Sequence, residues 1–136
     1  MALRFAAEAW GSEGELVTHP PLGRVEDGRL LLPTTALFLE IVKRRLAGES
    51  VSVLAAAFHV SLAELIGWGC RAAREKTGVS TVALSGGVFQ NTLLLRLVED
   101  NLRRDAFDVL RHRLIPANDG GLSLGQAVCA TARILD

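Results

Sequence analysis

Cysteine is scarce in this chain of 136 residues, which contains only Cys70 and Cys129. Each lies in a helical pattern, and neither belongs to a paired-cysteine metal motif. We therefore expect no disulfide and no cysteine-based metal site. Two buried thiols in a reducing compartment are the simplest interpretation, which predicts a cytoplasmic protein.

The chain also has no net charge, because 15 basic residues balance 15 acidic ones. No overall positive field favours nucleic-acid binding, although a neutral balance does not exclude a local basic patch. The apolar run at residues 1–10 is interrupted by charges and is too short for a signal peptide or a membrane span. We expect no membrane partner.

Several nucleotide and metal motifs are missing. The sequence has no GxGxxG motif and no Walker A lysine after a glycine turn. None of His19, His59 and His112 is followed four residues later by a second histidine, so no HxxxH pair exists. The length allows one domain with one core.

Residues 1–33 are predicted to form an irregular start, with a short helix over residues 2–10. Within this segment Asp27-Gly28 separates Leu22–Glu26 from Arg29–Leu32. An Asp-Gly pair between two apolar runs is a strong signal for a β-hairpin.

Two helices are predicted next. The first is capped by Thr34 or Thr35 and runs to about Ala47. Its apolar stripe comprises Leu37, Phe38, Ile41, Val42 and Leu46. The second opens at Ser50, runs to about Lys76 and stops at Gly78. Its apolar positions are Val51, Leu54, Ala55, Phe58, Leu62, Leu65 and Ile66.

The remainder alternates between strand and helix patterns. Strands are predicted over Thr81–Leu84 and Phe107–Leu110, and helices over Asn91–Arg104 and Gly120–Leu135. The helix over Asn91–Arg104 should bury Leu94, Leu95, Val98 and Leu102. This alternation indicates an α/β fold with a small sheet of parallel strands covered by helices. Ligands bind such sheets beyond the carboxyl ends of the strands.

Two glycine-pair turns fall at those ends. Ser85-Gly86-Gly87 follows the first strand, and Asp119-Gly120-Gly121 precedes the last helix. Adjacent glycines let a ligand approach the backbone, and helix N-termini favour anionic groups. The pair of turns suggests a nucleotide held between loops, although glycine pairs also mark ordinary tight turns.

The segments Leu84–Asn91 and Ile115–Ala127 together resemble the C-terminal end of the HypF-type carbamoyltransferases of nickel–iron hydrogenase maturation. Ala57-Phe58-His59 followed by Ser61-Leu62-Ala63 is similar to a helix of that family, so the resemblance covers roughly residues 30–135. Antibiotic O-carbamoyltransferases and tRNA threonylcarbamoyl-transfer proteins share the Ser-Gly-Gly element and are alternatives. A non-catalytic protein-interaction module with the same fold is another.

The resemblance implies an actin-like ATPase (ribonuclease H-like) fold, of which residues 34–136 would be the C-terminal lobe. It implies that carbamoyl-adenylate, an ATP-derived nucleotide, binds between two lobes and carbamoylates a cysteine thiolate of a HypE-type protein. Ser85, Gly86, Gly87 and Asn91 would bind the nucleotide, and Asp119 would be a ligand of a divalent metal, zinc or iron. Without the resemblance, Asp119 would be read as a helix N-cap.

Departures from the family pattern limit what this chain does alone. The metal-binding HxxxH pair, the N-terminal lobe and the adenylate-forming domain are missing from the sequence. We expect the isolated chain to be inactive, to hold no tightly bound metal and to self-associate through an exposed lobe interface.

Four further residues have predicted roles. His59 is expected to be a core-edge histidine with protein partners, and His112 a solvated strand end that could alternatively face phosphate. Gly121 and Gly125 should let the last helix approach the sheet closely.

Overall fold

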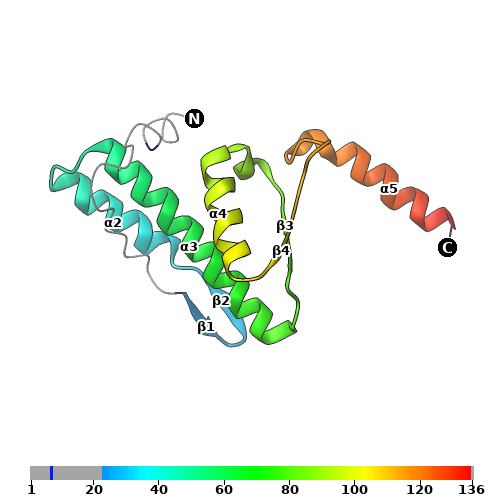
Figure 1. Cartoon of the computed structure of the whole chain (residues 1–136), viewed down its shortest axis with the longest axis horizontal. Coiled ribbons are helices and arrows are strands. Elements are labelled where there is room, and N and C mark those ends of the chain that lie inside the picture. Colours follow the sequence, from blue (N-terminus) through cyan, green and yellow to red (C-terminus); the bar gives the residue numbers. More distant parts are fainter. Residues whose placement is uncertain (1–6, 8–22, 136) are drawn as a thin grey trace.

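The computed structural model describes Ala7 and residues 23–135, in which packed helices lie beside a small sheet (Figure 1). The helix expected over residues 2–10 lies outside the described residues except for Ala7, which is helical and buried. The first described element is a hairpin of β1 (Arg24–Glu26) and antiparallel β2 (Arg29–Leu31). Asp27 and Gly28 both have positive φ, at 49° and 73°, which confirms the predicted two-residue turn.

Helix α2 (Thr34–Leu46) begins where predicted, but its cap and its buried face differ from the prediction. Pro33 occupies the N-cap position, and no side chain caps the helix, so the threonine cap was wrong. Only Leu37 of the apolar stripe is buried, whereas Phe38 is 61% exposed and Leu46 is 84% exposed. The described residues cover only one edge of the stripe, because α2 packs mainly against α3.

Helix α3 (Val51–Thr77) is the central element and matches its prediction at both ends. The hydroxyl of its N-cap Ser50 accepts a hydrogen bond from Val53 N–H at 3.4 Å. Gly78 ends the helix in the left-handed conformation with φ 74°, where glycine is favoured. The helix packs against α2 on one side and α4 (Thr92–Arg104) on another.

By length and composition α3 is also the one described helix that could cross a membrane, with a mean hydropathy of 1.6 over its most apolar window. Half of that window is buried inside the fold. The core helix of a soluble protein passes the same test, so this feature is weak evidence for a membrane span.

The strands β3 (Thr81–Leu84) and β4 (Asp108–Arg111) form a parallel pair, as predicted, with Thr81 opposite Asp108 and Leu84 opposite Arg111. The second strand starts one residue later than predicted, because the buried Phe107 still belongs to the approach from α4. Helices cover one face of the sheet. On the other face Ala83 and Leu110 are exposed.

The main core lies between α3, α4 and the covered face of the sheet. Its buried residues are Ala63, Leu84, Leu94, Val98, Leu102 and Phe107. The predicted inward face of α4 is confirmed at Leu94, Val98 and Leu102, and Leu95 packs partly buried against the same core. This core is what fixes the carboxyl ends of the two strands relative to α3 and α4.

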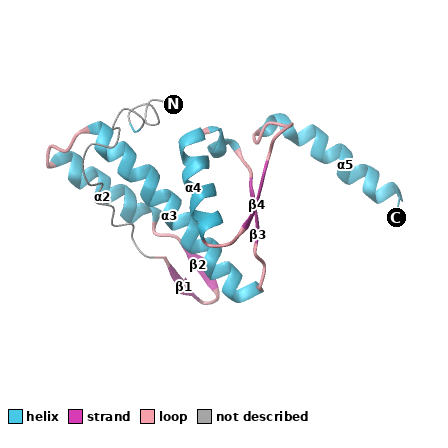
Figure 2. Cartoon of the chain, in the orientation of Figure 1, coloured by secondary structure: helices cyan, strands magenta, loops and turns pink. Residues whose placement is uncertain are grey.

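Helix α5 (Leu122–Leu135) extends away from the other elements, as Figure 2 shows. Gly125 has no described atom within 4 Å of the place a Cβ would take, so its predicted packing against the sheet was wrong. A Cβ on Gly121 would lie 2.9 Å from the Pro116 carbonyl oxygen, so Gly121 packs closely against its own loop. The prediction of two buried thiols also fails in part, because Cys129 on α5 is exposed and Cys70 is half-buried.

Candidate functional site

The first glycine turn leaves the carboxyl end of β3. Gly86 has φ 99° and ψ 159°, and Gly87 begins the short 3-10 helix η1 (Gly87–Gln90). Side chains with a Cβ rarely adopt the conformation of Gly86, so glycine is required there. A Cβ on either glycine would meet no described atom within 4 Å. The turn therefore presents its backbone to open space.

The second glycine turn lies directly against the first. The backbone N–H of Gly86 donates to the carbonyl oxygen of Ala117 at 2.7 Å. This bond joins the two turns and also uses the Gly86 N–H, which is then not free to bind a ligand. Within residues 23–135 no acceptor faces the N–H groups of Gly87 and Val88, so these two remain as donors.

Asp119 opens the short 3-10 helix η2 (Asp119–Gly121) on this second turn and is exposed. The cap of η2 is Asn118, whose Oδ1 accepts the Gly120 N–H at 3.1 Å. The alternative role of Asp119 as a helix cap is therefore wrong, and its carboxylate makes no hydrogen bond or ion pair with another described residue.

The residues present fit a metal only in part. Among the described side chains no three His, Cys, Asp or Glu residues lie close enough together to share an ion. Catalytic zinc commonly takes three protein ligands, so Asp119 alone does not make such a site. Any metal at Asp119 would need its other ligands from outside the described part of the chain.

Ser85 and His112 meet at the carboxyl edge of the sheet. The Oγ of Ser85 lies 2.9 Å from Nε2 of His112. Because Leu84 pairs with Arg111, the next residue of each parallel strand leaves the sheet at the same level. This contact was missed by the sequence interpretation, which favoured a solvated strand end for His112. The predicted parallel pairing was the signal that could have found it.

Asn91 sits between η1 and α4 and is tied down at both ends of its amide. Its Oδ1 accepts the Leu94 N–H at 3.1 Å, which caps α4, and its Nδ2 donates to Nε2 of His59 at 2.8 Å. His59 is only 2% exposed, and its Nδ1 donates to the Ala55 carbonyl at 2.7 Å. The expectation that His59 has protein partners is confirmed.

The two arginines beside His112 differ in their surroundings, because Arg111 forms an ion pair and Arg113 is exposed. Arg111 pairs with Glu99 at 3.0 Å, and Arg103 binds the other oxygen of the same carboxylate at 2.7 Å. Glu99 is buried, and the two arginines pair with a carboxylate that would otherwise be a buried charge without a partner. Arg111 thus braces β4 against α4, whereas Arg113 is exposed beyond the strand end.

Two shallow hollows, each of about 210 Å³, are both bordered by His112. One is bounded by Ser85, Leu110 and His112 from the strand ends. The other lies between η1 and the second turn and is bounded by Phe89, Pro116 and Ala117 among others. The predicted nucleotide turn and the segment before Asp119 therefore border the same open edge.

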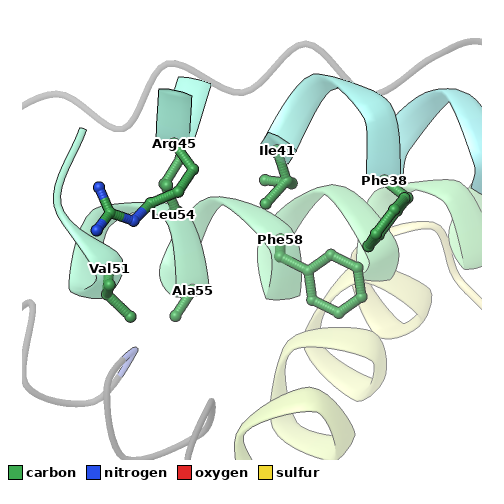
Figure 3. Close-up of a pocket in the computed structure, with 7 residues that line it drawn as sticks. All are labelled: Phe38, Ile41, Arg45, Val51, Leu54, Ala55 and Phe58. Carbon is green, nitrogen blue, oxygen red and sulfur yellow. The ribbon is translucent and has the colours of Figure 1, made fainter. Parts of the chain in front are cut away.

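A larger groove of about 340 Å³ lies between α2 and α3, away from the two turns (Figure 3). Its lining is apolar except for the Arg45 side chain and comprises Phe38, Ile41, Arg45, Val51, Leu54, Ala55 and Phe58. None of the predicted site residues contributes to it. Its composition suits an apolar side chain rather than a nucleotide.

Comparison with known families gives a match at residues 2–126 to the family described as "Carbamoyltransferase, Kae1-like Domain, second subdomain". The carbamoyltransferase HypF of Rhodobacter capsulatus is 41% identical over 65% of this chain and 12% of its own length. The carbamoyltransferase HypF2 of Cupriavidus necator is 31% identical over 98% of this chain and 19% of its own length.

Two solved structures are similar across nearly the whole chain. Full-length HypF in a phosphate- and nucleotide-bound form superposes with a TM-score of 0.85 at 30% identity, covering 98% of this chain and 17% of that one. HypF of T. kodakarensis superposes with a TM-score of 0.71 at 26% identity, covering 94% of this chain and 16% of that one. The small parallel sheet and its helices are thus an α/β lobe of the HypF type.

The chain spans less than a fifth of the length of these relatives. The family match nevertheless covers most of it, and the structural similarity extends through both glycine turns. The chain therefore belongs to the HypF carbamoyltransferase family, in which it corresponds to the second subdomain of the Kae1-like domain.

Proposed function

We propose that this chain forms one wall of a nucleotide cleft in a carbamoyltransferase of hydrogenase maturation. The substrate is carbamoyl-adenylate, and the acceptor is a cysteine thiolate of a HypE-type protein. The reaction takes place in the cytoplasm. The chain contributes binding groups, and an N-terminal lobe and an adenylate-forming domain supply the remainder of the cleft and its substrate.

The observation that carries this proposal is the hydrogen bond between Gly86 and Ala117. It brings two glycine turns, more than 30 residues apart in the sequence, to one open edge at the carboxyl ends of parallel strands. Such edges are where α/β sheets bind ligands. The nucleotide in the similar full-length HypF structure belongs to that protein, and its presence supports the assignment by similarity.

Each predicted residue has a role consistent with its position. Gly87 offers its N–H to a phosphate, and Gly86 shapes the turn with its positive φ. Ser85 adds a hydroxyl at the sheet edge, held by His112. Asn91 offers the nucleotide one amide hydrogen and one lone pair, since its other groups hold His59 and the Leu94 N–H.

In this cleft the acceptor thiolate attacks the carbamoyl carbon. A carbon–sulfur bond forms, the bond from carbon to the phosphate oxygen breaks, and AMP leaves with the electron pair. The N–H donors at the glycine turn stabilise the charge that AMP carries as it departs. A divalent metal, when bound with Asp119 as one ligand, would polarise the carbonyl.

Alone, the chain lacks the opposing donors and should not catalyse transfer. The exposed apolar residues on α2 and α5 indicate where covering surfaces are needed, and we propose that the N-terminal lobe of a complete carbamoyltransferase provides one of them. A pure interaction module would share these surfaces but would not bind nucleotide.

In the test, AMP and ADP are titrated into the wild type and two glycine variants, and heteronuclear NMR monitors binding. Gly87→Ala should weaken AMP binding by roughly tenfold, because the new methyl group points into the space a phosphate would occupy. Gly125→Ala is the matched control. Its Cβ also meets no described atom within 4 Å, but on α5 rather than at the turn after β3.

Shift changes confined to residues 84–91 and 115–121 would support the assignment. A wild type that binds neither AMP nor ADP at millimolar concentration, or equal affinities in the two variants, would overturn it. In that case a protein-interaction module becomes the better explanation.

A further inference from the structure

His59 is a buried polar residue that the proposed carbamoyl transfer does not use. It projects from α3 into the interior, only 2% exposed, with Ala55 and Asn91 as its two hydrogen-bond partners. The ring of Phe58 meets its ring edge-on at 5.9 Å between centroids. A polar ring so deeply buried is held where both of its nitrogens have partners.

The two contacts determine which nitrogen carries the hydrogen. The Ala55 carbonyl oxygen can only accept, so Nδ1 at 2.7 Å must be protonated. The Leu94 N–H can only donate, so the Asn91 amide turns its oxygen to Leu94 and its NH₂ group to Nε2, which accepts an amide hydrogen at 2.8 Å. These contacts place the ring hydrogen of His59 on Nδ1 and none on Nε2.

The opposite orientation of the Asn91 amide would not satisfy these partners. Exchanging its oxygen and nitrogen would point an NH₂ group at the Leu94 N–H and an oxygen at the bare Nε2. Donor would then face donor and acceptor would face acceptor. The existing arrangement, with Oδ1 at 3.1 Å from the Leu94 nitrogen, is the one that satisfies all partners.

We propose that His59 is a positioning residue that acts through Asn91. It ties α3 to the N-cap of α4 and holds the amide so that its remaining hydrogen and lone pair keep one orientation. This inference rests on the proposed nucleotide function, and it assigns recognition of the nucleotide partly to a residue that never touches it.

Nitrogen-15 NMR of the uniformly labelled wild type tests the geometry without any ligand. We expect Nδ1 of His59 at the shift of a protonated ring nitrogen and Nε2 at that of an unprotonated one. A protonated Nε2 would overturn the inference whatever the nucleotide result.

Affinity for AMP tests the consequence in two His59 variants. His59→Leu removes both ring nitrogens and should weaken AMP binding roughly five- to tenfold, the effect of about one misplaced hydrogen bond. His59→Gln places an amide oxygen where Nε2 lies and should restore most of the affinity. Leu65→Ala is the control for lost stability, because Leu65 is equally buried in α3 and its apolar side chain forms no hydrogen bond to Asn91.

Recovery in His59→Gln, with Leu65→Ala binding AMP as the wild type does, supports a positioning role. Equal weakening in all three variants would show that only the stability of α3 matters and would overturn it. If wild-type NMR shows the expected tautomer but no AMP binds, the proposed nucleotide function fails, and the His59–Asn91 contact is reduced to a packing role.

Discussion

The two cysteines have different surroundings, and their chemistry should differ accordingly. Cys70 packs half-buried against the main core, and burial raises the pKa of its thiol, with a smaller opposing effect from Arg71. Cys129 is exposed on α5. Because the thiolate is the reactive form, we expect Ellman's reagent to modify Cys129 in a fast phase and Cys70 in a slower one.

Single-cysteine variants check the assignment. Cys129→Ser should abolish the fast phase, and Cys70→Ser should leave it unchanged. Two equal rates in the native wild type would mean that α5 is covered in solution, contrary to its exposure here.

Asn91 also has a consequence for stability at this scale. Replacing it by alanine removes the cap of α4, worth about 1 kcal/mol, and leaves the buried Nε2 of His59 without a donor, worth about 1–3 kcal/mol more. We expect Asn91→Ala to lower the free energy of unfolding by roughly 2–4 kcal/mol, measured in urea.

Ser50→Ala is the matched control, because Ser50 caps α3 but holds no buried group. Its loss should stay near 1 kcal/mol. Equal losses in the two variants would show that the His59 contact adds nothing. The same comparison is needed to interpret nucleotide affinity in Asn91→Ala, where folding and binding change together.

At the scale of elements, an ion pair closes the link between α2 and α3. The Arg44 guanidinium binds both carboxylate oxygens of Glu49, with Nε–Oε2 at 2.6 Å and Nη2–Oε1 at 2.5 Å. The hydrogen bond from Arg44 holds the pKa of Glu49 below its usual value of 4.5, with a smaller opposing effect from burial. The folded state thus favours the ionised carboxylate.

This pair predicts a small pH-dependent stability. Its contribution is complete above the ordinary pKa of 4.5 and is lost as the pH falls through the lower pKa of the folded state. Because the pair is partly exposed, we expect wild type and Glu49→Gln to differ by no more than about 1 kcal/mol at neutral pH. Urea unfolding of both across the acid range should show the gap closing below the ordinary pKa. A constant gap would contradict the prediction.

For the whole molecule, the main feature is how much apolar surface the described residues leave open. Phe38 and Leu46 on α2, Leu110 on the sheet, and Val128 and Ile134 on α5 are all more than half exposed. Parallel sheets are normally covered on both faces, yet β3 and β4 are covered on one. These surfaces are suited to partner contacts.

We therefore expect concentration-dependent self-association in light scattering. Phe38→Asp, at an exposed apolar position of α2, should shift the equilibrium towards monomer, because a carboxylate in an apolar contact must be desolvated. The control Arg24→Ala changes an exposed hairpin residue and should have no such effect. A clean wild-type monomer at every concentration would contradict the expectation.

Much of the local structure followed from the sequence. The Asp27-Gly28 turn, the stop at Gly78 and the strand over residues 81–84 depend on backbone preferences of a few adjacent residues. The caps at the starts of α2 and η2 were harder to predict, since Pro33 rather than a threonine precedes α2 and Asn118 rather than Asp119 caps η2. The open stripe of α2 could not be foreseen, because periodicity shows that a face is apolar and does not show what covers it.

The sequence by itself determined the family, the order of strands and helices, and the positions of the two glycine turns. Only the tertiary structure decided which residues meet. It joined Gly86 to Ala117, Ser85 to His112 across 27 positions and His59 to Asn91 across 32. The physical reason is the separation along the chain over which each kind of interaction acts. Turn and helix preferences act over a few residues, whereas these contacts depend on strand register and on how α3, α4 and the sheet share one core.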